Sequence, residues 1–137
     1  MADLKEKGIA LLSSTSVTMG TNANGTKQIL YTVPHGKDCV ITEVIIRNPG
    51  ATLAGCNDVD FGVGAACATE AFLNNETGIG DMTATTDFMR LVTSSNEYSV
   101  IDGSNTTKAN TQFGIQIIAG ATSAAVTATI DVFGYIF

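Results

Sequence analysis

Several features that mark nucleic-acid-binding and catalytic proteins are scarce in this sequence. The chain has no tryptophan, a single histidine (His35) and only 15% charged residues, below the typical share of about a quarter. Its seven lysine and arginine residues form no basic stripe, whereas binding to nucleic-acid phosphates needs clustered positive charge. With a net charge of −6, the composition predicts an acidic globular protein that does not bind nucleic acid.

Long apolar segments are also missing. No run of about 18 apolar residues occurs, so no membrane-spanning helix is predicted. The first seven residues, MADLKEK, lack the apolar core of a signal peptide. The three cysteines, Cys39, Cys56 and Cys67, are odd in number and have no zinc-type C-x-x-C spacing. We therefore expect a reducing site of synthesis, and buried free thiols that pack as small hydrophobic groups.

Short apolar runs separated by turn signals fill most of the chain, and no helix of ten residues or more is predicted. This pattern is typical of an all-β fold, an antiparallel β-sandwich that is jelly-roll-like and has seven to eight strands, although its even spacing also fits a small barrel. Residues 1–27 are predicted to be an N-terminal arm and residues 28–137 the β-sandwich domain. The expected strands are 28–33, 39–47, 58–63, 70–73, 88–93, 98–102, 111–119 and 125–137.

Turn chemistry predicts two hairpins among these strands. Pro34-His35-Gly36-Lys37 separates the first two strands, with proline fixing φ at the turn entry and glycine supplying a positive φ. Ser94-Ser95-Asn96 is expected to join 88–93 to 98–102 in the same way.

Residues that could carry chemistry are few, and none has a companion motif. His35 lies in a turn, where no rigid neighbour is expected to orient it as a catalytic base. Asp58 and Asp60 are two apart on one strand and share a face, so they could bind Ca²⁺ or act as an acid–base pair. We interpret them as a solvated strand face and Cys39 as a buried structural thiol, and assign no catalytic, cofactor-binding or metal-binding residue.

Two apolar segments are candidate contact surfaces. In the arm, the segment that contains Gly8, Ile9, Leu11 and Leu12 is predicted to dock on a partner. In the last strand, one face is predicted to join the core through Val126, Ala128, Ile130, Val132 and Ile136. The other face ends in Phe133, Tyr135 and Phe137, which we predict to form a subunit interface unless a loop or the arm of the same chain covers them.

The segment LYTVPHGK (residues 30–37), with the Ile- and Val-rich strand and Asn48 that follow it, resembles a known sequence pattern. It is similar to small β-proteins of tailed bacteriophages and prophages that carry a YTVPxGK hairpin: capsid decoration proteins, head-fibre bases and tail-associated modules. His35 stands where a small residue is usual. Because the motif is a turn, this departure affects no functional residue.

The resemblance implies a non-enzymatic structural protein of the virion, made in the bacterial host cytoplasm. A capsid decoration (cement) protein is the first expectation: a symmetric homo-oligomer, with a trimer favoured, bound to the phage major capsid protein or another virion protein. No cofactor, nucleic acid or membrane is expected. The alternative is a carbohydrate- or receptor-binding β-module of a phage tail or fibre, with Asp58, Asp60 and the loop 74–87 at its site. The absence of tryptophan disfavours sugar stacking, and a hydrolase is a third, weaker hypothesis.

Overall fold

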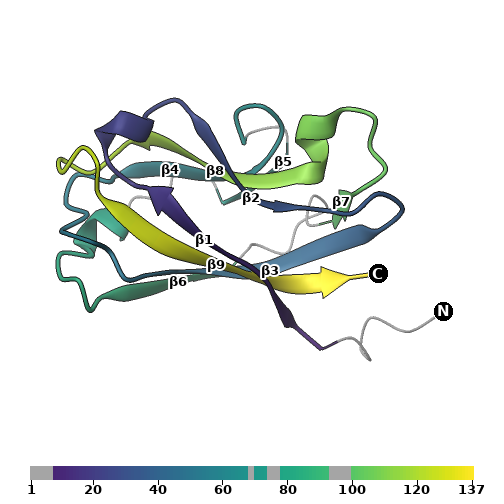
Figure 1. Ribbon diagram of the computed structural model, residues 1–137, viewed down its shortest axis with the longest axis horizontal. Helices are drawn as coiled ribbons and strands as arrows, with labels where there is room; N and C mark the ends of the chain where they lie inside the picture. Colours follow the sequence, from purple (N-terminus) through teal and green to yellow (C-terminus); the bar gives the residue numbers. More distant parts are fainter. Residues whose placement is uncertain (1–7, 68–69, 74–77, 93–99) are drawn as a thin grey trace.

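The computed structural model describes residues 8–67, 70–73, 78–92 and 100–137, which form two antiparallel sheets packed face to face (Figure 1). The five-stranded sheet has the order β1 (Ala10–Thr18), β9 (Thr127–Ile136), β3 (Asp38–Arg47) and β6 (Phe88–Val92), with β7 (Val100–Asp102) also paired to β3. The four-stranded sheet has the order β2 (Lys27–Thr32), β8 (Gln112–Ala119), β4 (Asp58–Val63) and β5 (Glu70–Leu73). Short 3-10 turns are η2 (Thr21–Ala23), η3 (Gly78–Asp81) and η4 (Lys108–Thr111). Within these ranges no helix is long and apolar enough to cross a membrane.

The prediction of an all-β antiparallel sandwich is confirmed, and the strand order is that of a jelly roll. β6 and β7 both run antiparallel to β3, β6 opposite Glu43–Arg47 and β7 opposite Asp38–Val40. They therefore lie one after the other along the same edge of β3, and the hairpin expected between them is wrong. Counted as one interrupted strand, they leave eight strand positions in two four-membered layers, as in a jelly roll.

The hairpin expected around Pro34–Lys37 is also wrong, although the turn itself forms. Lys37 donates its backbone N–H to the Pro34 carbonyl at 3.1 Å, and Gly36 has a φ of +81°. However, β2 pairs with β8 and β3 pairs with β9, so this turn links the two sheets. A tight turn reverses the chain locally, but the partner of each strand is decided by which apolar faces the whole sandwich buries.

Strand β1 lies inside the segment predicted to be an arm. Ala10–Thr18 pairs antiparallel with β9, so regular structure begins before Gln28, while residues 1–7 lie outside the described residues. Val17 is buried in the core, whereas Ser14 and Ser16 are exposed. The serine- and threonine-rich composition of this strand hid its alternation, because its inward face is only partly apolar.

The core fills the space between the sheets. Phe113 of β8 stacks on Phe61 of β4 at a centroid distance of 6.4 Å and meets Phe72 of β5 edge-on at 5.3 Å. All three cysteines are buried and free, as expected. Burial raises the pKa of the Cys39 thiol to about 12 and of the Cys56 and Cys67 thiols to about 11.

Candidate functional site

The outer face of the five-stranded sheet brings together apolar side chains from five strands. In one row across this face, Phe133 of β9 lies between Leu11 of β1 and Glu43 of β3, and Val92 of β6 follows Glu43. In the next row Tyr135 lies opposite Val40, which lies opposite Val100. We call the apolar members of these rows the apolar outer face: Leu11, Val40, Val92, Val100, Phe133 and Tyr135.

This face is only partly covered by the chain itself. Leu11 is 55% exposed, Val92 56% and Val100 44%, and the rings of Phe133 and Tyr135 are half-buried. The apolar side chains therefore offer area that a further contact could remove from water.

Two irregularities in the strands place these residues. The β3–β9 register shifts between Ile41 and Glu43, which adds one residue to β3. Cys39 and Ile41 therefore point inward before the shift, and Val44 and Ile46 point inward after it. A strand without this bulge would place Val40 and Val44 on the same face, whereas here Val40 points outward and Val44 is buried.

Gly134 of β9 allows this strand to lie close to β3 beside Val40. A Cβ at this position would overlap the Val40 carbonyl oxygen of β3. Glycine between Phe133 and Tyr135 thus lets β9 lie close enough to β3 for the two rings to project side by side from the sheet.

Four charged groups on the same face form two ion pairs. The Asp131 carboxylate, only 8% exposed as a residue, accepts hydrogen bonds from Arg47 Nε at 2.7 Å and from Ser14 Oγ at 2.7 Å. The bond from Arg47 holds the pKa of Asp131 below its usual value. Arg90 forms an ion pair with Glu43. The four groups sum to zero charge, while Asp38 and Asp102, which lie opposite each other at the end of the same face, leave it with a net charge of −2.

Only some of the residues predicted to form contacts lie on the apolar outer face. Phe133 and Tyr135 project from the sheet as expected, while Phe137 follows β9 and exchanges two backbone hydrogen bonds with Asp38. In the predicted arm segment, Leu11 joins the apolar outer face beside Phe133, Gly8 and Ile9 are exposed, and Leu12 packs against the core. The sequence analysis treated the two segments as separate sites and missed Val40, Val92 and Val100, because a pattern within one strand does not indicate which strands are its neighbours.

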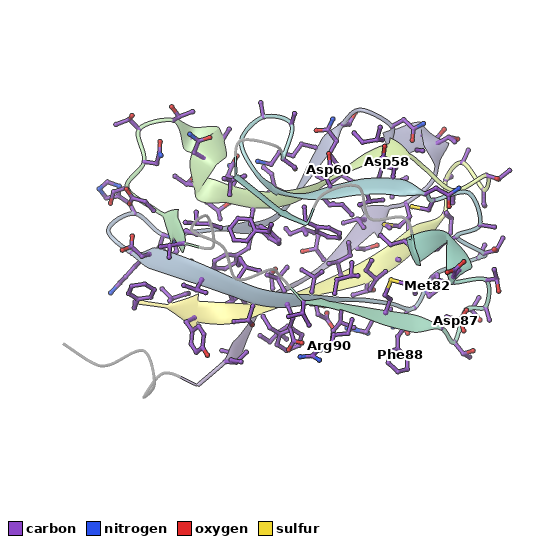
Figure 2. The ribbon with its side chains drawn as sticks, turned by 180° about the vertical axis from the view of Figure 1, so that it is seen from behind. Asp58, Asp60, Met82, Asp87, Phe88 and Arg90 are labelled. Atoms are coloured by element: carbon purple, nitrogen blue, oxygen red, sulfur yellow. The ribbon has the colours of Figure 1, made fainter. Side chains whose placement is uncertain are left out.

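The other candidate residues lie elsewhere. Figure 2 shows Asp58 and Asp60 on β4, in the opposite layer from Phe88 and Arg90 of β6. Asp60 is 9% exposed, so the expected solvated face is wrong for this residue. His35 is exposed in its turn. Within the described ranges, no three His, Cys, Asp or Glu side chains lie close enough together to hold a metal ion.

The described part of the loop 74–87, which the alternative hypothesis places at a binding site, is anchored to the sandwich. Ile79 and Met82 are buried in the core, and Leu53 donates its backbone N–H to the Met82 carbonyl at 2.9 Å. Beside Met82, a hollow of about 330 Å³ is lined by Asp81, Met82, Thr86, Asp87, Phe88 and Met89. Phe88 is 76% exposed at its rim.

No protein-family model and no curated protein matches this sequence. Two solved structures have a similar course of the chain. A chain of the capsid of Ralstonia phage GP4 aligns over 95% of this chain and 84% of its own, with 17% identity and a TM-score of 0.46. A chain of Mud Crab Dicistrovirus aligns over 98% of this chain and 71% of its own, with 12% identity and a TM-score of 0.35. Both scores lie below 0.5, so the jelly-roll assignment rests on strand order and not on these likenesses.

Proposed function

We propose that this chain is a non-enzymatic structural protein of a bacteriophage virion, a capsid decoration protein that self-assembles through its apolar outer face. The observation that carries the proposal is the exposed apolar face on which Phe133 and Tyr135 meet Leu11, Val40 and Val100. A protein that acts by shape and buried area needs such a surface. The YTVPHGK segment supports the virus type, and the partner would be the major capsid protein or another virion protein.

The apolar area of the two rings favours a contact that is repeated between several copies. Burying about 100 Å² of each half-exposed ring would stabilise a contact by roughly 2.5 kcal/mol at about 25 cal/mol/Å². Association costs about 4–15 kcal/mol in lost freedom, so the roughly 5 kcal/mol from two rings on one copy offsets only the lower end of that cost. Symmetric contacts repeat the gain on every copy, and a trimer is the oligomer that we propose.

Light scattering during size-exclusion chromatography tests the proposal. The variant Phe133→Ser with Tyr135→Ser and Phe137→Ser should give a folded monomer that no longer decorates particles, whereas the wild-type chain should elute as an oligomer. A matched control is Ile29→Ser with Ile118→Ser, two exposed apolar residues of the other sheet, which should keep the oligomer. An unchanged oligomer in the triple variant rules out this interface. An unfolded chain would show that the rings stabilise the domain itself.

A further inference from the structure

Strand β1 has one open edge in the described part of the chain. It lies at the end of the five-stranded sheet and pairs with β9 alone. Hydrogen bonds at the C-terminal end of β1 show which backbone groups point toward β9 and which point toward the open edge. Met19 donates its N–H to the Val126 carbonyl at 2.8 Å, on the β9 side. Thr18 instead donates to Gln28 Oε1 at 2.9 Å and accepts from Gln28 Nε2 at 2.8 Å.

The Gln28 amide therefore occupies the position that a neighbouring strand would take. Because backbone groups alternate along an antiparallel strand, the N–H and C=O of Ser16 and Ser14 point the same way as those of Thr18. Beyond Ser14 the register shifts between Leu11 and Ser13. Ser14 and Ser16 are thus the two regular positions of the open edge that Gln28 leaves free.

The β1 edge differs from the other sheet edges because its strand carries no charged residue. Natural proteins protect open edges with charged residues or proline. The other edge strands each carry a charge: Lys27 in β2, Glu70 in β5, Arg90 in β6 and Asp102 in β7. β1 (ALLSSTSVT) contains neither a charged residue nor proline. Two copies of it can therefore face each other without placing like charges in contact.

We propose that β1 is a self-pairing edge, which joins the five-stranded sheets of two copies across a two-fold axis. This inference rests on the proposed function and deepens it. The copies of a trimer are related by a three-fold axis, so a two-fold β1 contact would join a copy of one trimer to a copy of another. The free positions fix the register: Ser14 of each copy lies opposite Ser16 of the other, and the axis passes between the two Thr15 residues. Each Ser14–Ser16 pair exchanges both of its N–H···O bonds. The two apolar outer faces then lie on the same side of one continuous sheet.

Disulfide trapping at the axis tests this register directly. Facing residues of a non-hydrogen-bonded antiparallel pair have Cα atoms about 4.5 Å apart, within the range that a disulfide spans. Thr15→Cys should form a covalent dimer under mild oxidation, while Thr127→Cys, exposed on the neighbouring strand β9, should form none above background. The three native cysteines are buried and provide a low background.

A second variant separates pairing from chance collision. Ser16→Pro removes an N–H that points to the open edge and leaves the β1–β9 ladder intact. In the Thr15→Cys background it should reduce trapping about tenfold or more, since each copy loses one hydrogen bond of the ladder. Equal dimer yields from Thr15→Cys and Thr127→Cys, or trapping unaffected by Ser16→Pro, would overturn the inference.

The outcome is independent of the outer-face variant. If trapping fails while the triple serine variant still converts an oligomer to a monomer, edge pairing is wrong and the proposed function stands. If trapping succeeds and the triple variant has no effect, the edge is the contact and the proposed interface is wrong.

Discussion

Replacing Lys27 by methionine should destabilise the domain even though it removes a partly buried charge. Lys27 Nζ donates hydrogen bonds to the carbonyls of Gly64 and Gln112 at 2.8 Å each and of Ala109 at 3.3 Å. The Lys27 stem passes directly over Gly114, where a Cβ would lie 2.7 Å from Lys27 Cε. One ammonium group thus links β2 to Gly64, which follows β4, to η4 and to the first residue of β8.

Two effects compete at this site. Burial disfavours the ammonium and lowers the Lys27 pKa from 10.5, so the free energy of unfolding should rise as pH approaches 10.5 from the lowered value. Against this, hydrogen bonds that involve a charged donor are worth about 1.5–3 kcal/mol each. With three acceptors, and with a discount for partial exposure, we expect a net loss of about 2–4 kcal/mol in Lys27→Met.

Urea unfolding at pH 7 measures this loss. Lys108→Met, at an exposed lysine of η4, is the matched control and should change the free energy of unfolding by less than about 0.5 kcal/mol. If Lys27→Met is as stable as the control, desolvation of the ammonium cancels its hydrogen bonds, and the reasoning above is refuted.

Three further predictions concern the thiols, Asp131 and Gly134. Because burial raises their pKa to about 11–12, the thiols should react with an alkylating reagent at pH 8 only as fast as the domain unfolds; rapid labelling of the folded protein would contradict this. The lowered pKa of Asp131 stabilises the fold above pH 3.8, and this contribution is lost as pH falls through the lowered value. Asp131→Asn should therefore lose less stability than the wild-type chain as the pH falls, as measured by circular dichroism. Gly134→Ala should lower the melting temperature by several degrees, because its methyl group overlaps the Val40 carbonyl oxygen; an unchanged melting temperature would show that β3 and β9 can separate.

Local patterns predicted most strands but few of their partners. In the predicted strand 58–63, Val59, Phe61 and Val63 alternate with Asp58 and Asp60, and all three apolar residues are buried. The turn at Pro34–Lys37 was predicted with its positive φ at Gly36, yet the sheet to which each flanking strand belongs is set by contacts between residues distant in the sequence. A window of ten residues carries no information about those contacts.

The candidate site was half predictable for the same reason. Phe133 and Tyr135 share one face of a strand by alternation alone. Their neighbour Leu11 could not be placed because the serine-rich β1 resembles a polar linker, and because the shift between Leu11 and Ser13 moves its register by one residue. Asp60 was misjudged because a carboxylate on a strand is usually solvated, whereas here tertiary packing covers it.

Leu11 connects the two proposed contacts. It lies on β1, whose open edge carries the free backbone groups of Ser14 and Ser16, and its side chain continues the row of Phe133 across the apolar outer face. A partner strand paired to β1 would extend the sheet beside Leu11 and cover part of its exposed side chain. Hydrogen bonds along a short edge are worth about 1 kcal/mol each and cannot by themselves offset the loss of freedom on association. Burial of apolar area beside the same edge would add to the free energy of these hydrogen bonds. We therefore expect the β1 edge and the apolar outer face to stabilise the assembly together.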